Sequence, residues 1–243
     1  MKKQAIVWML AILTLIQFSG CNVDELCCGS VKGSGDVVEV EYSFGNFTKV
    51  DVSYAFEATI LPSDTFFVML NVDDNIVKYL DVYKSGDWLV IELDDDKNYN
   101  NVHLYAEIHM PIIQELKASG ASDIELTGFS SNHDFDIDLS GASMLSGNIE
   151  ADDCHFELSG ASVINLSGGC NNLEIEASGA SVLHMGNFVC YSGDFHLSGA
   201  SDATVHVTDF LSATLSGASV LRYYGDPEIE NLNISGASVI TKL

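Results

Sequence analysis

Carboxylates recur at two fixed positions in the C-terminal half of the chain, five and three residues before the glycine of a repeated Ser-Gly-Ala-Ser motif. The candidate cation ligands at these positions are Asp136, Asp138, Glu157, Glu174, Glu176 and Asp194. If the repeats stack, each position becomes a column of carboxylates about 5 Å apart, where unpaired like charges repel. Ca²⁺ with oxygen ligands would relieve this repulsion. We therefore expect either a Ca²⁺ site here or solvated side chains that splay apart.

Cysteines offer a second kind of chemistry. Cys170 and Cys190 both lie nine residues before the glycine of their repeat. Stacking would bring their Cα atoms within the range of a disulfide, and an oxidising compartment would allow the bond. The sequence predicts a Cys170–Cys190 bridge, with two buried free thiols as the alternative. Cys154 falls in an apolar column and is expected to be a buried thiol.

The serines of the motif do not indicate a catalytic nucleophile. Seven equivalent serines would mean seven active sites, and the chain has no Gly-x-Ser-x-Gly elbow. We predict no catalytic residues and no cofactor other than Ca²⁺.

Charge excludes one class of partner. The chain has 35 acidic and 10 basic residues, a formal net charge of -25. Binding to phosphate backbones needs Lys and Arg clusters, which are missing, so nucleic acid is not an expected partner.

The N-terminus predicts export and a lipid anchor. Lys2 and Lys3 precede an apolar run over 5–18 that suits a signal peptide better than a membrane span. The run ends in Phe18-Ser19-Gly20-Cys21, which is similar to a bacterial lipobox. We assign 1–20 to a lipoprotein signal peptide and Cys21 to lipidation, with an ordinary cleaved signal as the alternative.

Residues 21–36 then form the lipidated end and a polar tether. The predicted location is the cell envelope of a Gram-negative bacterium, as an outer-membrane lipoprotein held by its acyl chains. Asp24 and Glu25 follow the cysteine, where some lipoproteins carry an export signal. A periplasmic and a surface-exposed position both remain open.

A repeat must position the candidate residues. The Ser-Gly-Ala-Ser motif occurs seven times, at spacings of 21, 19, 19, 20, 18 and 19 residues. Its glycines are Gly120, Gly141, Gly160, Gly179, Gly199, Gly217 and Gly236. Such a period indicates a solenoid. Glycine suits the bend because it lacks Cβ and tolerates positive φ.

Alternation of apolar and polar residues flanks every copy in the same phase, as in strands with one buried face. We predict an all-β, single-stranded right-handed parallel β-helix with about 19–20 residues per rung over 118–243. Residues 37–117 also alternate but lack the motif, and we expect them to cap or extend the solenoid.

The chain also resembles a known family. The segments that carry the resemblance are 47–52, 74–77, 85–91 and 110–116, the last containing Met110-Pro111 and leading into Ser119-Gly120-Ala121-Ser122. Together they are similar to the head GIN domain family, over roughly residues 35–243. The resemblance implies an exported β-helical protein of Gram-negative bacteria, often a lipoprotein, of a kind described as adhesins. It supplies no catalytic residues.

Three functions fit these observations. The first is a binding or adhesion module that contacts a glycan or a protein at the cell surface. The second is a carbohydrate-active β-helix enzyme, which would need paired carboxylates, or Lys and Arg near Ca²⁺, in one cleft. Arg222 is the only arginine of the chain, so we favour the binding module. The third is a purely structural envelope lipoprotein.

Overall fold

The computed structural model describes residues 29–243. The predicted signal peptide (1–20) and the lipidation of Cys21 lie outside the described residues. Within them, no helix has the length and apolar character needed to cross a membrane. One turn of 3₁₀ helix, η1 (Val77–Tyr79), is the only helical element of this part of the chain.

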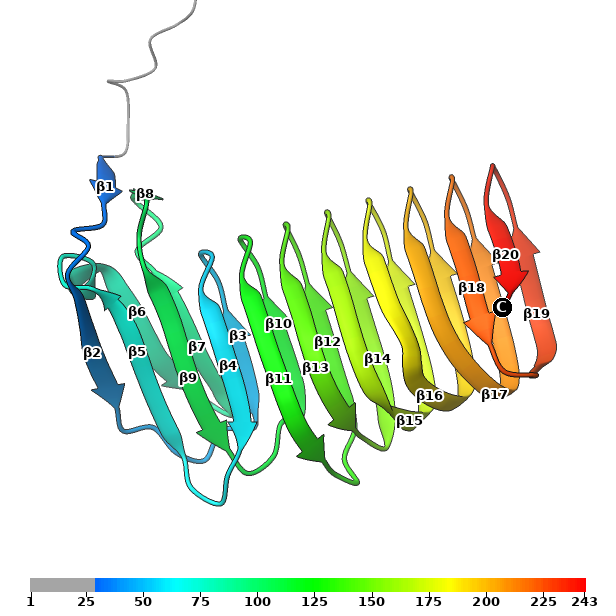
Figure 1. Cartoon of the computed structure of the whole chain (residues 1–243), viewed down its shortest axis with the longest axis horizontal. Coiled ribbons are helices and arrows are strands. Elements are labelled where there is room, and N and C mark those ends of the chain that lie inside the picture. Colours follow the sequence, from blue (N-terminus) through cyan, green and yellow to red (C-terminus); the bar gives the residue numbers. More distant parts are fainter. Residues whose placement is uncertain (1–28) are drawn as a thin grey trace, which may run out of the picture.

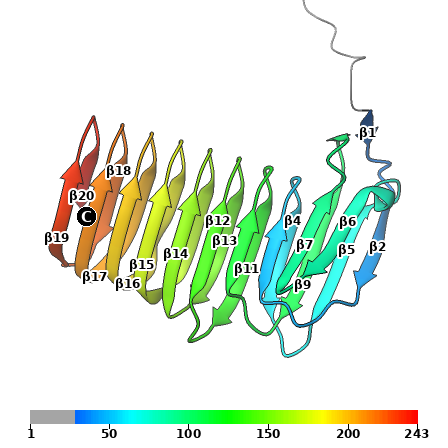
Figure 2. The ribbon, with the colours of Figure 1, turned by 180° about the vertical axis from the view of Figure 1, so that it is seen from behind.

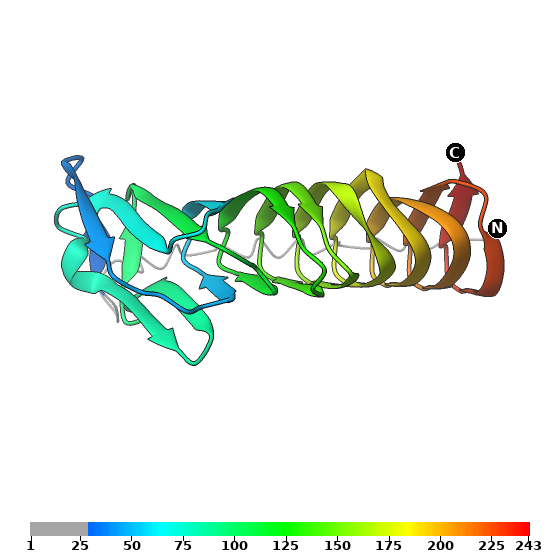
Figure 3. The ribbon, with the colours of Figure 1, turned by 90° about the horizontal axis from the view of Figure 1, so that it is seen from below.

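Stacked coils form most of the molecule (Figure 1). Each coil places one stretch of strand on each of two opposite faces, and Figure 3 shows the resulting flattened tube from below. The strands of the repeat region are β10 (Glu115–Ala118), β11 (Asp123–Ser130), β12 (Phe135–Leu139), β13 (Met144–Glu150), β14 (Asp153–Leu158), β15 (Val163–Ala177), β16 (Val182–Leu197), β17 (Asp202–Leu215), β18 (Val220–Tyr224), β19 (Glu228–Ile234) and β20 (Val239–Lys242). All of them pair with a neighbouring coil in parallel register. The predicted parallel β-solenoid is confirmed.

The core follows from the alternation. The apolar residues four positions after each glycine pair with one another along the stack and are fully buried, from Ile124 to Leu221. Aromatic rings fill the opposite side of the interior, where Phe156 lies 6.3 Å from Phe135 and 6.1 Å from Phe188 between ring centroids. Burial of this continuous apolar column drives the winding, since no single coil can cover its own inner face.

The glycine corners stack as predicted. All seven motif glycines have positive φ, between 66° and 74°. Successive corners are joined by hydrogen bonds such as that from Ala180 N to Gly160 O, 2.8 Å. A Cβ on Gly179 would lie 2.3 Å from Gly160 O, closer than real contacts allow. Glycine is therefore required twice at this corner, for its backbone angle and for the close approach of the next coil.

The second serine of the motif points inward. In the first six copies its side chain is buried and its hydroxyl donates to the carbonyl of the first serine, at 2.9 Å from Ser162 Oγ to Ser159 O. This bond satisfies a polar group that would otherwise be costly inside the tube. The first serine is half-buried or exposed in every copy.

Residues 37–117 both extend and cap the solenoid (Figure 2). Their strands are β2 (Val37–Tyr42), β3 (Lys49–Val52), β4 (Glu57–Pro62), β5 (Phe67–Asp73), β6 (Leu80–Ser85), β7 (Trp88–Leu93) and β9 (Leu104–Met110). β3 and β4 pair in parallel with β10 and β11, and β7 and β9 pair in parallel with β3 and β4, so the parallel stacking continues into this region. Beyond it the pairing turns antiparallel, where β5 and then β2 are added to β9 on one side and β6 is added to β7 on the other. These antiparallel strands end the stack and cover its N-terminal core.

The chain enters this cap through β1 (Ser30–Lys32), which pairs in parallel with β8 (Asn98–Asn100). Strand pairing therefore begins at Ser30, within the segment 21–36 that was assigned to the tether. The buried carboxylate of Asp73 fixes this entry by accepting from Gly35 N at 2.8 Å and His103 N at 2.7 Å.

Candidate functional site

Two columns of polar side chains run along one face of the tube. The column five residues before each glycine contains Glu115, Asp136, His155, Glu174 and Asp194, in direct register from coil to coil. The column three residues before contains Lys117, Asp138, Glu157, Glu176 and His196. The stacking of the candidate residues is therefore as predicted from the repeat.

Histidines interrupt the carboxylates. His155 Nε2 lies 3.3 Å from Glu157 Oε1, and His155 Nδ1 lies 3.8 Å from Glu174 Oε2. His196 Nε2 lies 3.4 Å from Asp194 Oδ1. Protonation of either imidazole would place a positive charge between neighbouring carboxylates and reduce their repulsion.

Lysines neutralise the N-terminal end of the same face. Lys49 Nζ lies 2.7 Å from Glu115 Oε2, and Lys117 Nζ lies 3.5 Å from Glu115 Oε1. Both ammonium groups also sit over the Trp88 ring, 5.4 and 4.8 Å from its centroid. Excess negative charge is therefore concentrated beyond Glu115, from β12 onward.

Burial acts on one carboxylate in particular. It raises the pKa of Asp136 above the ordinary aspartate value, and repulsion from Glu115 adds to the rise while His155 opposes it. The raised pKa means that the folded protein accommodates the charged form of this one carboxyl group less favourably than water does.

The carboxylates do not form a ready-made cation cage. Among the described residues, the one group of three acidic, His or Cys side chains whose ligand atoms lie within 4.8 Å of one another is Asp94, Asp95 and Asp96. This loop follows β7 and lies away from the columns. Ca²⁺ binding by the six candidate carboxylates would thus require their side chains to converge, and it stays a prediction.

A shallow groove of about 650 Å³ lies along the acidic face. Its lining comes from Asp134, Asp136, Asp153, Cys154, His155, Asn172, Leu173, Glu174, Ser192, Gly193, Asp194, Phe210, Ser212 and Glu230. The lining contains no Lys or Arg. Phe210 supplies an apolar wall and is 44% exposed. A neighbouring hollow of about 330 Å³ includes Glu157, Glu176 and His196.

Sequence reasoning missed a third column of this groove, seven residues before the glycine. Asp153, Asn172, Ser192 and Phe210 pair successively there. Asn172 Nδ2 donates to Asp153 Oδ1 at 2.7 Å. The sequence contains a signal for this column, because polar residues recur seven positions before the glycine, in phase with the outward-facing residues five and three positions before it.

The opposite face has a different character. Its outward column pairs Ser146, Asn165, His184, Thr204 and Arg222 in register. Arg222 is paired with Asp202, and no run of carboxylates comparable to the acidic face occurs among these paired residues. The two faces of the tube therefore present distinct surfaces to a ligand.

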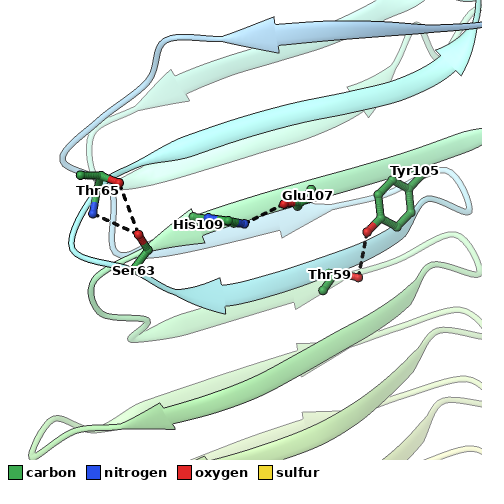
Figure 4. A network of polar contacts seen from close by, with 6 residues as sticks. All are labelled: Thr59, Ser63, Thr65, Tyr105, Glu107 and His109. Atoms are coloured by element: carbon green, nitrogen blue, oxygen red, sulfur yellow. Dashed lines mark hydrogen bonds and ion pairs between the residues drawn. The ribbon is translucent and has the colours of Figure 1, made fainter.

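Polar contacts also fix the outer surface of the cap (Figure 4). Tyr105 Oη donates to Thr59 Oγ1 at 3.2 Å, joining β9 to β4. Glu107 Oε1 lies 2.8 Å from His109 Nε2 on β9, and Thr65 N donates to Ser63 Oγ at 3.2 Å in the turn after β4. These contacts are local, and they stabilise strand pairing and turn geometry.

Cys170 and Cys190 are direct partners on β15 and β16, as the repeat predicts. Within 29–243, however, the cysteines are free, buried thiols. Cys170 Sγ donates to Asn172 O and Cys190 Sγ to His206 O, both at 3.3 Å. Side chains of directly paired residues in parallel strands run side by side, whereas a disulfide needs Cβ atoms within about 3.8 Å. The structure therefore has the alternative state, two buried thiols, and the bridge stays a prediction. Cys154 is buried as expected.

Comparison with known proteins supports the fold. A protein from Bacteroides fragilis described as "a putative adhesin" has a TM-score of 0.82 at 19% identity, and the match covers 88% of this chain and 100% of that one. A "putative lipid binding protein" from Parabacteroides distasonis gives 0.72 at 16% identity, with 88% and 100% covered. A "putative adhesin" from Parabacteroides merdae gives 0.67 at 17%, with 88% and 99% covered. At these identities the likeness shows the fold alone. No curated protein matches the chain.

A family comparison goes further than the fold. The family described as "Putative auto-transporter adhesin, head GIN domain" matches residues 46–227. This segment takes in strands β3 to β18 and six of the seven motif glycines, and it contains the segments that carried the resemblance in the sequence. Since the match spans well over half of the chain, the protein belongs to the head GIN domain family.

Proposed function

We propose that this protein is a lipid-anchored binding module of the bacterial cell envelope, which holds its ligand in the acidic groove and performs no catalysis. The observation that carries the proposal is the groove itself. It spans successive coils, presents hydrogen-bond acceptors at regular intervals, and includes neither Lys nor Arg.

The lining indicates which ligands fit. Carboxylate, amide and hydroxyl groups from Asp153, Asn172 and Ser192 lie in one line, about 5 Å apart along the stack. Phe210 follows them in the same column with an exposed aromatic ring. An extended ligand rich in donors, with an apolar face for Phe210, suits this arrangement. A polyhydroxylated glycan and a Lys-rich protein segment both have these properties.

Binding of two probes tests the proposal. A panel of neutral oligosaccharides and a lysine-rich peptide would be titrated calorimetrically against the wild type, the double variant Glu174→Gln/Asp194→Asn, and the control Glu125→Gln on the other face. We expect one probe to bind the wild type and the control but to bind the double variant roughly tenfold more weakly. Added salt would weaken the peptide complex and leave a neutral glycan complex almost unchanged.

Three results would oppose the proposal. Equal binding to the wild type and the double variant would show that the probe binds to another surface. Failure of both probe classes to bind would favour a structural lipoprotein. Release of reducing ends from an oligosaccharide would favour the carbohydrate-active enzyme.

The anchor and its location need a separate test. Metabolic labelling with a fatty-acid analogue is expected to mark the wild type and not Cys21→Ser. Protease treatment of intact cells then distinguishes the two locations. Digestion indicates surface exposure, and protection excludes a surface adhesin.

A further inference from the structure

The C-terminal end of the solenoid differs from the rest because its inner face is open. Leu232 and Ile234 on β19 continue the column of Ala213 and Leu215, which are 1% exposed one coil earlier. At the end, Leu232 is 41% and Ile234 45% exposed. Leu243, at the same end, is 51% exposed. Side chains of core type are therefore exposed at the open end of the last coil, which Figure 1 shows in red.

Two strand edges border this apolar strip. β19 pairs only with β17, and β20 pairs only with β18, among the described residues. Each strand therefore presents backbone N–H and C=O groups toward the open end. Such edges are templates for pairing with another strand.

The other end of the molecule is protected by contrast. Antiparallel strands of the cap cover its core, and the edge strands β2 and β6 carry Glu39, Glu41 and Asp81. Charged residues on an edge strand discourage pairing. Any association through strand edges is therefore directed to the C-terminal end.

The columns five and three residues before the glycine also lack charged residues near this end. The positions occupied by Glu174 and Glu176 in the middle of the tube are taken by Ser212 and Thr214, and then by Asn231 and Asn233. Glu228 and Glu230 lie in the first half of β19, so the segment 231–234 is free of charge. On the other sheet, Lys242 is neutralised by Asp226 at 2.6 Å.

We propose that this end binds the same end of a second copy, giving a dimer joined end to end across a two-fold axis. The occupant must pair with two open strand edges and also cover the apolar strip between them, and a second copy meets both requirements. A single extended peptide can pair with one edge but leaves the other edge and the apolar strip open. A lipid surface would leave the backbone groups of both edges without partners. A second copy supplies two edges at the same separation, with a matching apolar strip between them.

The symmetry is compatible with strand pairing. A two-fold axis that lies across the end reverses the direction of β19, so the two copies of this strand meet antiparallel, as in continuous sheets. When the pairing is centred on Asn233, Leu232 lies opposite Ile234 of the second copy. Inward residues then face inward residues, and the core continues from one molecule into the other.

Light scattering on the full chain in detergent, coupled to size separation, tests the proposal. The variants are Leu232→Glu, at the open end, and Val38→Glu, an equally exposed apolar residue on the capped end (41% and 38%). We expect the wild type and Val38→Glu to be dimers. Leu232→Glu should have a dissociation constant roughly tenfold higher or more, because a charge would be buried without a partner. Added salt should strengthen the wild-type dimer by screening the acidic bodies.

Circular dichroism would show whether Leu232→Glu folds. Leu243→Glu is a second variant, placed at the chain terminus, where a substitution disturbs folding less. A monomeric wild type would overturn the proposal. So would a dimer that survives both end variants, since the association would then come from another surface or from the lipidated terminus.

Discussion

Replacing Gly179 by alanine tests whether close stacking of the corners holds the coils together. Gly179 has φ of +74° and lies in the middle of the tube. An added Cβ would lie 2.3 Å from Gly160 O and 3.1 Å from Gly160 C. Both atoms are backbone atoms of the previous coil, so neither can move aside without breaking the hydrogen bond from Ala180 N to Gly160 O.

The expected cost has two parts. Left-handed backbone costs an L-residue about 1–2 kcal/mol. Overpacking against a fixed backbone costs about 1–3 kcal/mol more. We therefore expect Gly179→Ala to lower the free energy of unfolding by about 2–5 kcal/mol, a large part of the stability of an ordinary domain.

Gly86 separates the two parts. It lies in the β6–β7 hairpin with φ of +60°, and a Cβ there would meet nothing within 4 Å. Gly86→Ala should therefore cost only the backbone part, about 1–2 kcal/mol. Urea unfolding followed by circular dichroism measures both variants. If Gly179→Ala is no more destabilising than Gly86→Ala, steric stacking of the corners is not what requires glycine.

Three further predictions follow from single residues. Ser162→Ala should lower the free energy of unfolding by about 1 kcal/mol, because it removes the buried hydrogen bond to Ser159 O. Ser159→Ala should be nearly neutral, and equal effects of the two substitutions in urea unfolding would contradict the assignment of the inward serine. Burial raises the pKa of Asp136, so the folded state binds the proton of this carboxyl group more tightly than the unfolded state does. The stability that this proton confers is therefore present at acidic pH and is lost as the pH rises through the raised pKa. Asp136→Asn should therefore raise the melting temperature at pH 7 by a small amount, roughly 1–3 °C, and should reduce the gain in stability on acidification; an unchanged pH dependence would refute this. Both cysteines are buried, and burial raises the pKa of the Cys190 thiol. In the thiol state of the structure, Cys170 and Cys190 should therefore resist alkylation in the folded protein and react fully in denaturant without reductant. Peptide mass spectra showing both residues unmodified after that treatment would instead establish the predicted bridge.

Much of the architecture could be predicted from the repeat. A period near 19 residues with alternation in constant phase allows only one register, because a slip by one residue would turn the whole apolar set outward. The positions of Asp136, His155 and Glu174 in one column, and of Cys170 opposite Cys190, follow directly from that register. The coils differ in length, but this register is kept, because shifts in strand pairing near Asn165 and His184 accommodate the extra residues.

The amino-acid sequence by itself determined the winding, the inner face and the family, because these depend on local periodicity repeated many times. Only the tertiary structure decided that Ser162 rather than Ser159 faces inward, that Phe210 joins Asp153 in a groove, that antiparallel strands close one end, and that β1 pairs with β8. Those features depend on side-chain direction at corners and on pairing between segments that occur once. A pattern read along the chain contains no repeated signal for either.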